Sequence, residues 1–571
     1  MKKFLAMLLA LTMALAIFTG IAESDAVELS VYCYYDSAKG IDPANLYWWR
    51  YAEARLAEQG YNVKLNVTGG SGDEATQGKA LRIGSDNLPD IMFGFTLTGP
   101  EIVLYGDNAD MLLDLTPYLN AEDMPNAYEC SITNGADAFA SSVSPEGKIY
   151  GVPYVVDRTL GWLAGTSPNW NCIWVNMTML EELGYEMPHT ADELLDALRA
   201  AKDYETEDGK EMIPILGGDG GYLNTAVFSY LGFYGYDTLY GVDPCIKDGE
   251  IVLPIFSEEY KTYLEFFHTL YEEGLISSEY FTMDGNTMKA LAKEGNFLIS
   301  TRNLPEISDD PAIFHQYEAL APIYFDEEVK PVACATVPYT CNRVWASAKT
   351  EHPDEVIALF DLLYDDEAIM NYVYGPVLED KLGILEYAWV VNEAGNDLVH
   401  PQVAPDKEYT TINDLQFNVI APTGLIGDMS NYNFHAKNVV AGLDFNLEYE
   451  TYIDAVTGET VTVTNKSNYP GKYDTSVDAY YRLNRYYAWI DNLSTVRPAM
   501  LYCSEEESQR ITDLKSALDN YVRENFAQFV TGGRDIEDFD AYQEELKAMG
   551  VEELLDIYQR GYAPYIESIF G

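Results

Sequence analysis

Basic residues are scarce in this 571-residue chain. It has 35 lysines and arginines against 92 aspartates and glutamates, which gives a formal net charge of −57 at pH 7. Nucleic acids and anionic membrane surfaces attract proteins through basic patches, so we expect neither as a partner. A small anionic ligand held by one or two local arginines stays compatible with this charge.

Cysteine and histidine are also sparse. A secreted disulfide scaffold would be shorter and richer in cysteine, and a zinc site needs clustered cysteine and histidine. None of the six histidines begins an HExxH motif, and no two cysteines form a CxxC pair. We therefore expect no cofactor and no zinc, while a pairing of Cys334 with Cys341 stays open. The seven cysteines are Cys33, Cys130, Cys172, Cys245, Cys334, Cys341 and Cys503.

Complete catalytic motifs are missing too. QGKA at 77–80 ends like a phosphate-binding loop, but Asp73 stands where the earlier glycine belongs and Ala80 replaces the serine or threonine. GGSGD at 69–73 is one residue short of a GxSxG nucleophile elbow. Among 92 acidic residues some carboxylate pairs are inevitable. A secreted glycan-active hydrolase that uses such a pair stays an alternative, without a motif that favours it.

A hydrophobic run long enough to span a bilayer is absent, since the N-terminal run is too short and no later run approaches 18 residues. The longest run, residues 4–18, follows two lysines and precedes small residues, which is the layout of a secretory signal peptide. We expect residues 1–22 to be removed after export through the Sec route. The mature chain is then a soluble protein of about 545 residues, enough for two or three domains.

Extended and helical patterns alternate along the chain. Residues 27–35 and 61–67 alternate like strands, and 45–60 between them read as a helix. This alternation predicts parallel βαβ units and an α/β fold with helices on both faces of its sheets. Residues 445–469 predict a hairpin that turns at Thr457 and Gly458, and the chain after about residue 475 is mostly helical. No repeat or linker-like tract separates autonomous domains, which favours interwoven lobes.

The stretch IWVNMTMLEELGYEMPHTADELL at 173–195 gathers a histidine and five carboxylates, the materials of acid–base chemistry. Thr190 and Glu193, however, have the spacing of a helix capping box. Gly184 has the position of a left-handed residue that ends the preceding helix. We therefore interpret the stretch as helix boundaries, with His189 exposed beside the cap, and not as an active site.

Loops after the predicted strands are the expected place for a ligand, because open α/β sheets bind beyond the carboxyl ends of their strands. These loops combine aromatic residues with Asp, Asn and Arg, which suits the apolar faces and hydroxyl groups of a sugar. Filling of the core is the alternative for each aromatic residue. Trp48 and Trp49 point to different sides of one helix, so we expect only Trp49 to face the ligand. The candidate ligand-binding residues are Trp48, Trp49 and Trp162 for stacking, Asp36, Asp157, Arg158, Asp219 and Arg302 for hydroxyl groups, and Phe95 and Tyr222 as flanking walls.

Seven segments, in this order along the chain, resemble family 1 extracellular solute-binding proteins. The resemblance covers nearly the whole mature chain and is closest to the lipoprotein-like subgroup associated with oligosaccharide uptake through ABC importers. No single segment is specific, but seven in one order are unlikely to coincide by chance. They are GSDNLPDIMF (84–93), LLDLTPYL (112–119), EGKIYGVPY (146–154), residues 169–203, TLYEEGLI (269–276), residues 352–368 and residues 529–562.

The resemblance implies a type II periplasmic-binding-protein-like fold, in which two α/β lobes are joined by hinge crossings and the C-terminal part is helical. Lobe 1 is then 27–152 plus about 337–385, and lobe 2 is 153–336 plus about 386–571. A monomer without enzymatic activity is implied, which binds an oligosaccharide between the lobes and delivers it to the permease subunits of an ABC transporter. A receptor for peptides or another small solute on the same fold stays an alternative.

Two departures from the family limit this expectation. Many relatives carry a lipidated cysteine at the cleavage point, whereas residues 18–26 contain none, so we expect no lipid anchor. Some relatives carry a calcium loop near residues 203–214, where Asp203, Glu205 and Glu207 would be the ligands. Asp208 replaces the loop glycine and Pro214 replaces the bidentate glutamate, which makes this calcium site a weak candidate.

Overall fold

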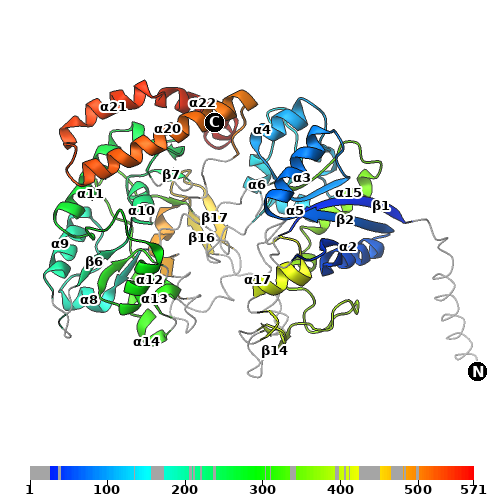
Figure 1. Cartoon of the computed structure of the whole chain (residues 1–571), viewed down its shortest axis with the longest axis horizontal. Coiled ribbons are helices and arrows are strands. Elements are labelled where there is room, and N and C mark those ends of the chain that lie inside the picture. The colour runs from blue at the N-terminus through cyan, green and yellow to red at the C-terminus, as the bar shows by residue number, and fades with distance from the viewer. Residues whose placement is uncertain are drawn as a thin grey trace, which may run out of the picture.

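The computed structural model shows two α/β lobes side by side (Figure 1). The first lobe comprises residues 26–155 and 342–423, and the second comprises 173–334 and 450–571. The predicted signal peptide lies outside the described residues. The structure does not describe 1–25, 36–39, 134–135, 156–172, 205–208, 210–211, 219–221, 236–239, 303, 309, 335–341, 392–397, 404–406, 410–411, 424–449, 464–479, 481–483, 486, 495 and 497–499.

A five-stranded sheet in the order β2-β1-β3-β13-β4 forms the centre of the first lobe. β1 (Val27–Tyr34) pairs in parallel with β2 (Val63–Gly70) along its whole length and with β3 (Ile91–Leu97) near its end. β13 (Asn342–Ala346) pairs antiparallel with β3 and with the short β4 (Gly151–Val152). The predicted parallel strands at the start of the chain are confirmed.

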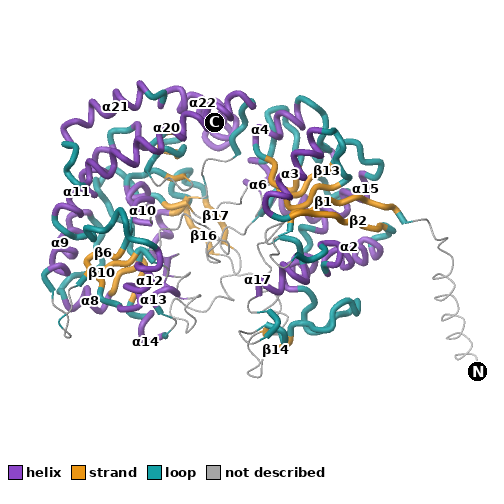
Figure 2. The backbone as a smooth tube through the Cα atoms, in the orientation of Figure 1, coloured by secondary structure: helices purple, strands orange, loops and turns teal. Residues whose placement is uncertain are grey.

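The two faces of this sheet carry separate hydrophobic clusters, because successive side chains of a strand point to opposite faces. Val31 and Cys33 of β1 pack on the side of α2 (Tyr47–Glu58), whereas Tyr32 packs on the side of α3 (Gly72–Gly84). The helices around the sheet are visible in Figure 2. The other α-helices of this lobe are α4 (Gly99–Glu101), α5 (Pro125–Ile132), α6 (Ala136–Ser141), α15 (Pro353–Leu362), α16 (Asp366–Tyr374) and α17 (Ile412–Leu415).

The second lobe contains a four-stranded sheet in the order β11-β5-β10-β6. β10 (Phe297–Ser300) is parallel to β6 (Ile213–Leu216) and antiparallel to β5 (Trp174–Asn176), which pairs antiparallel with β11 (Tyr317–Ala319). The helices that precede the C-terminal region are α8 (Met177–Glu182), α9 (Ala191–Lys202), α10 (Tyr222–Tyr230), α11 (Glu259–Glu272), α12 (Gly285–Glu294), α13 (Leu304–Ile307) and α14 (Pro311–Phe314).

Smaller strand pairs complete the fold. The predicted hairpin is confirmed, with strands β16 (Glu450–Ile453) and β17 (Thr460–Val463) and a left-handed Gly458 at φ +71° in its turn. The remaining strands are β7 (Tyr234–Gly235), β8 (Cys245–Lys247), β9 (Glu250–Val252), β12 (Ala333–Cys334), β14 (Val390–Val391), β15 (Leu398–Val399) and β18 (Leu493–Ser494).

The C-terminal region is helical, as predicted. α20 (Glu505–Val530), α21 (Phe539–Ala548) and α22 (Val551–Phe570) cover one side of the second lobe, where they are drawn in orange and red in Figure 1. Phe526 and Phe529 of α20 join the same hydrophobic cluster as α11. These helices are thus part of the second-lobe core and do not form a separate domain.

The capping prediction in the stretch 173–195 is confirmed. The Thr190 side chain accepts a hydrogen bond from the Glu193 N–H at 3.2 Å, and the Glu193 carboxylate accepts one from the Thr190 N–H at 3.2 Å. Gly184 follows α8 in the left-handed conformation at φ +84°, and His189 is exposed. The polar groups of this stretch therefore satisfy helix ends.

The first lobe extends further along the chain than the sequence predicts. Residues after about 386 were expected in lobe 2, but Trp389, Leu415 and Ile420 pack in the first-lobe core. Ile420 approaches Gly375, which follows α16, so this excursion folds back onto helices of the first lobe. The expected boundary is wrong because these apolar contacts are tertiary and have no local signature in the sequence.

Residues 500–502 lie between the two lobes. Met500 and Tyr502 pack against the first-lobe cluster on the α3 side of the sheet, whereas Leu501 packs against the core of the second lobe. Alternate side chains of this extended segment thus enter the cores of different lobes. This segment therefore contacts both lobes, although it is not part of a sheet in either of them.

Candidate functional site

Two chain connections between the lobes are attached directly to strands of the first-lobe sheet. Both are attached at the same end of the strands. β1, β2 and β3 are parallel, and β4 runs with them because both β3 and β4 pair antiparallel with β13. The chain leaves this lobe after β4, by Val155, and returns at Asn342, where β13 begins. Both points lie at the edge where β1 and β3 have their carboxyl ends.

The second lobe has the same arrangement. β6 and β10 end at Leu216 and Ser300, which are register partners, and Trp174 at the start of β5 lies opposite Ser300. Ala319 at the end of β11 also lies opposite Trp174. The chain therefore enters and leaves this sheet at the edge where β6 and β10 end.

The connections thus join the carboxyl edge of one sheet to the carboxyl edge of the other. Thr423, the last described residue before a third connection, lies beside Gly94 and Tyr34 at the first-lobe edge, with its Cγ2 3.3 Å from where a Cβ on residue 94 would lie. In open α/β sheets ligands bind in the crevice beyond the carboxyl ends of the strands. The topology therefore points to the space between these two edges as the ligand site.

An aromatic stack supports the first-lobe edge. Phe95 stacks on Tyr32 with ring centroids 5.2 Å apart, and the Arg82 guanidinium also lies over the Tyr32 ring, with its Cζ 3.5 Å from the ring centroid. Burial raises the pKa of Tyr32, although the positive charge of Arg82 opposes this shift. The edge of a third ring, Tyr34, meets Phe95 at 6.2 Å. This stack holds the ends of β1 and β3 in fixed positions.

Phe95 lies at the predicted edge but is only 6% exposed, so it offers little surface to a ligand. Its carbonyl oxygen accepts a hydrogen bond from the buried Trp345 Nε1 at 2.8 Å, which anchors it further. The half-buried Tyr34 reaches the edge instead. Sequence analysis did not select Tyr34, although its place at the end of the alternating strand was the available signal.

Tyr222 and Arg302 lie after the two parallel strands of the second lobe, as predicted. Tyr222 begins α10, which follows β6, and Arg302 follows β10; both side chains are partly exposed. The buried Ser300 Oγ accepts a hydrogen bond from the Arg302 N–H at 3.1 Å. Arg302 and Tyr222 are therefore the described candidates that occupy the expected edge.

Glycine allows the two loops at the second-lobe edge to lie close together. The Thr301 N–H donates to the Leu216 carbonyl oxygen at 2.9 Å, so the loops after β6 and β10 lie against each other. A Cβ on Gly217 would lie 3.1 Å from the Thr301 hydroxyl oxygen, which is tighter than ordinary contact. A side chain at 217 would push these two loops apart.

Trp48 and Trp49 are not ligand-stacking residues, and the expectation that Trp49 faces the ligand is wrong. Both are buried in the first-lobe core, at 0% and 2% exposed. Trp48 meets Tyr372 of α16 edge-on at 4.9 Å, and Trp49 meets Phe93 of β3 at 4.9 Å. The helix α2 is packed between the sheet and α16, so both sides of its first turn are covered.

The remaining site predictions fall outside the described residues. These are Asp36, Asp157, Arg158, Trp162 and Asp219, together with Glu205 and Glu207 of the calcium candidate. Asp203 is exposed at the end of α9. Within the described part of the chain, no group of three or more His, Cys, Asp or Glu residues is placed to hold a metal ion.

The described residues give no support for a reactive cysteine or for a membrane-spanning helix. Cys33, Cys130, Cys245 and Cys503 are buried, and Cys341 of the suggested pair is not described. Burial raises the pKa of the Cys33 thiol to about 12, which makes it a poor nucleophile. No helix in the described ranges is both long and apolar enough to cross a membrane.

Comparison with known proteins finds a matching family. Residues 42–298, which span parts of both lobes, match the model of the bacterial extracellular solute-binding proteins. This region of the chain is therefore similar to that family. Members of the family are substrate-binding proteins and not enzymes, and the family name implies a location outside the cytoplasm.

Two curated relatives match this chain. The fructooligosaccharide ABC transporter substrate-binding protein FusA of Streptococcus pneumoniae is 22% identical over 439 residues, which cover 75% of this chain and 71% of FusA. Lipoprotein LipO of Bacillus subtilis is 25% identical over 177 residues, 30% of this chain and 31% of LipO. The match to FusA is long enough to include residues of both lobes, whereas the match to LipO covers less than a third of this chain.

Solved structures of low sequence identity share the fold over 95% of the chain. An HMO-binding, ABC-transporter-associated solute-binding protein from Bifidobacterium longum infantis is 19% identical, with a TM-score of 0.68 and 100% of that chain covered. FusA of S. pneumoniae in complex with kestose is 18% identical, with a TM-score of 0.60 and 100% covered. The two-lobed fold expected from the sequence is therefore confirmed.

Proposed function

We propose that this protein is the substrate-binding subunit of an ABC importer and that it binds an oligosaccharide between its lobes. The observation that carries the proposal is the joining of the two sheets at their carboxyl edges, because a ligand held there touches both lobes at once. FusA, whose described ligand class is fructooligosaccharides, supports the choice of ligand. A membrane permease then receives the sugar.

A ligand that contacts both edges stabilises the closed arrangement of the lobes, because it binds this arrangement better than the open one. In the second lobe Arg302 supplies a forked donor for hydroxyl or carboxylate oxygens, and Tyr222 supplies a ring face beside it. Asp36, Asp157, Arg158, Trp162 and Asp219 belong to the proposal as further contacts from the connecting loops.

Binding is tested by calorimetry and thermal shift with the purified chain and a panel of kestose, nystose, milk, mucin and plant oligosaccharides. We expect at least one sugar to raise the Tm and to change the tryptophan fluorescence, with the sugar recovered unchanged. Cleavage of the sugar in proportion to protein concentration would overturn the proposal in favour of a hydrolase. A rise in Tm with peptides and with none of the sugars would overturn the proposal in favour of a peptide receptor.

The site is tested by Arg302→Ala and Tyr222→Ala. Each substitution removes a proposed contact, so we expect each to weaken sugar binding at least tenfold, about 1.4 kcal/mol. Arg199→Ala is the matched control, because Arg199 lies on the outer surface of α9 in an ion pair with Glu273 and not at either sheet edge. Equal affinity in all three variants would remove this edge from the site.

Export is the last part of the proposal. Cleavage after about residue 22 without lipidation predicts a mature N-terminus near residue 23 or 27, which mass spectrometry of the protein from its native host measures directly. LipO is named a lipoprotein, and an acyl group found on this chain would contradict the unlipidated form.

A further inference from the structure

Exposed apolar side chains concentrate on one excursion of the first lobe. Of twelve large apolar residues that are exposed within the described ranges, five lie between residues 378 and 399, each 39–46% exposed. Such clustering is unusual, because exposed apolar residues normally occur singly. We call these five the apolar ridge: Leu378, Leu382, Tyr387, Val390 and Val399.

The ridge has a fixed structure. Trp389 is buried in the first-lobe core, and its backbone donates a hydrogen bond to the Pro376 carbonyl oxygen at 3.0 Å and accepts one from the Leu378 N–H at 2.7 Å. The Asp380 carboxylate accepts from the N–H groups of Leu382 and Leu385 at 3.0 and 2.6 Å. Leu378 and Leu382 are therefore presented by a hydrogen-bonded segment that Trp389 anchors in the core.

Leu378 adds a sign of function. Its φ of +65° is in the left-handed region, which a leucine adopts only at a cost of roughly 1–3 kcal/mol. The strained residue is also one of the exposed ones, so the strain does not serve to bury it. Strained backbone of this kind persists where the surrounding structure holds it, and it clusters at functional sites.

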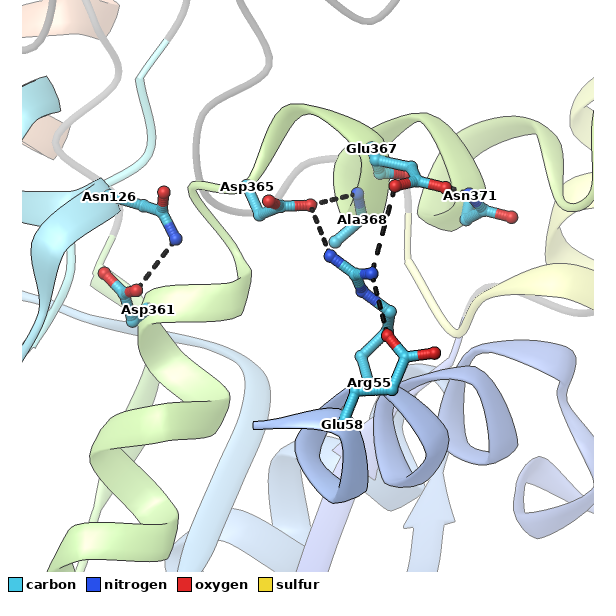
Figure 3. Close-up of polar contacts among 8 residues, drawn as sticks. All are labelled: Arg55, Glu58, Asn126, Asp361, Asp365, Glu367, Ala368 and Asn371. Atoms are coloured by element: carbon cyan, nitrogen blue, oxygen red, sulfur yellow. Dashed lines mark hydrogen bonds and ion pairs between the residues drawn. The ribbon is translucent and has the colours of Figure 1, made fainter. Parts of the chain in front are cut away.

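An acidic groove adjoins the ridge. It has a volume of about 910 Å³, lies between α2, α16 and the ridge loop, and includes Leu378 and Leu382 in its wall. Arg55 is held inside it by Glu58 at 3.0 Å and by Asp365 at 3.7 Å (Figure 3). The five carboxylates that line the groove are Glu58, Asp365, Asp366, Glu367 and Glu379, against the two cations Arg55 and Lys381.

These charges select the occupant. An anionic lipid surface would be repelled by the carboxylates, and so would a second copy of a chain with a net charge of −57. A metal ion is disfavoured, since no metal-competent group is found within the described residues. A basic protein segment flanked by apolar side chains fits both the groove and the ridge. Its cation would lie in the acidic groove, and its apolar side chains would pack on the apolar ridge.

We propose that the ridge and the groove together form the docking surface for a basic, apolar-flanked segment on the extracytoplasmic side of the membrane transporter. This inference rests on the proposed function, which supplies such a partner. In Figure 1 the ridge strand β14 lies at the opposite end of the first lobe from α4, away from the C-terminal helices. The surface is therefore separate from residues 500–502, which link the lobes.

The test uses proteoliposomes that contain the cognate permease and ATPase subunits, with the full-length mature chain added outside. Leu382→Lys and Val390→Lys place a cation on the ridge, so we expect each to lower stimulation of ATPase activity at least fivefold. Leu81→Lys and Ile453→Lys are matched controls, because these exposed apolar residues lie elsewhere, on α3 and on β16, at 70% and 64% exposed. We expect both controls to stimulate like the unmodified chain.

Sugar binding separates this inference from the proposed function. We expect Leu382→Lys and Val390→Lys to bind the sugar identified in the panel with a Kd within twofold of the unmodified chain. Loss of stimulation with loss of affinity would assign the ridge to the ligand site, and undiminished stimulation would overturn the docking surface. An unmodified chain that binds no sugar would instead overturn the proposed function.

Further measurements test whether the surface instead binds a lipid membrane or a second copy of the chain. Glu379→Lys is expected to lower stimulation more at low than at high ionic strength, because salt screens the repulsion that it introduces. Sedimentation of the chain with vesicles of phosphatidylglycerol and phosphatidylcholine is expected to show no binding, and sedimentation equilibrium to show a monomer. Vesicle binding or dimerisation that Leu382→Lys abolishes would overturn the proposal in favour of a lipid or a second copy.

Discussion

The carbonyl oxygen of Leu501 lies against the Cα of Gly99, where a side chain on residue 99 would have to be. Gly99 begins α4 in the first lobe, while Leu501 packs into the core of the second lobe. On the other side of the same segment, a Cβ on Gly561 of α22 would overlap the Leu501 side chain. The segment is thus packed tightly between a glycine of each lobe.

Gly99→Ala is expected to destabilise the protein by about 1–3 kcal/mol, because the added methyl group must displace backbone atoms. Gly84→Ala is the matched control: this glycine ends α3, with no atom within 4 Å of the position of a Cβ and no left-handed φ. Alanine there should be neutral or stabilise by up to about 1 kcal/mol. Urea denaturation measures both, and equal stabilities would contradict the close packing at Gly99.

Trp48 and Trp49 are expected to respond differently to phenylalanine. Trp49 Nε1 donates to the Pro43 carbonyl oxygen at 2.9 Å, whereas the buried Trp48 Nε1 has no partner in the described structure. Trp49→Phe therefore loses a hydrogen bond worth about 1 kcal/mol and leaves a buried acceptor, while Trp48→Phe removes an unsatisfied donor. Thermal denaturation should rank Trp49→Phe as less stable, with sugar affinity unchanged in both.

Thr190→Ala is expected to cost about 1 kcal/mol, because the N–H of Glu193 at the start of α9 loses its cap. Thr190→Ser keeps the hydroxyl and should restore most of this stability. Denaturation of the two variants checks the cap, and an alanine variant as stable as the serine variant would show that the capping box contributes nothing.

Asp361 makes stability depend on pH. Burial raises the pKa of this carboxyl to about 6, although hydrogen bonds from the Ala127 N–H at 2.9 Å and the Asn126 amide at 2.8 Å favour the ionised form (Figure 3). Since the folded chain holds this proton more tightly than the unfolded chain, ionisation of Asp361 lowers stability. The loss is absent below about pH 4 and complete above about pH 6.

The free energy of unfolding of the unmodified chain relative to Asp361→Asn should therefore rise by on the order of 2 kcal/mol as the pH falls from about 6.5 to about 4. Exposed Asp540, replaced by Asn, serves as the control for the general effect of removing one negative charge. The prediction fails if both variants show the same pH dependence relative to the unmodified chain.

Local features of the sequence predicted the local structure. The Thr190 and Glu193 spacing, Gly184, the first strands and the hairpin at Gly458 depend on contacts within a few residues, and each is confirmed. The edge position of Tyr222 and Arg302 also followed, because the carboxyl end of a parallel strand is fixed by the order of strand and helix.

Features that depend on distant contacts were not predictable in this way. Trp48 is covered by Tyr372, more than 300 positions away, and Ile420 packs beside Gly375 although the sequence suggested the other lobe. One signal for Trp48 was present, since Tyr47, Trp48, Trp49 and Tyr51 form a wide apolar face on the first turns of α2, where Arg50 is exposed. A wide apolar face of a helix packs against the core, so both tryptophans could have been expected there.

The alternation of side chains at 500–502 also bears on how the protein unfolds. If the second lobe unfolds, Leu501 loses its packing there. Met500 and Tyr502, the residues on either side of Leu501, are then pulled out of the first-lobe core. Local unfolding of one lobe thus removes contacts from the other within a single stretch of three residues. The two lobes should consequently melt as one cooperative unit, and a hydrogen-exchange experiment should find no state in which only one of them is protected.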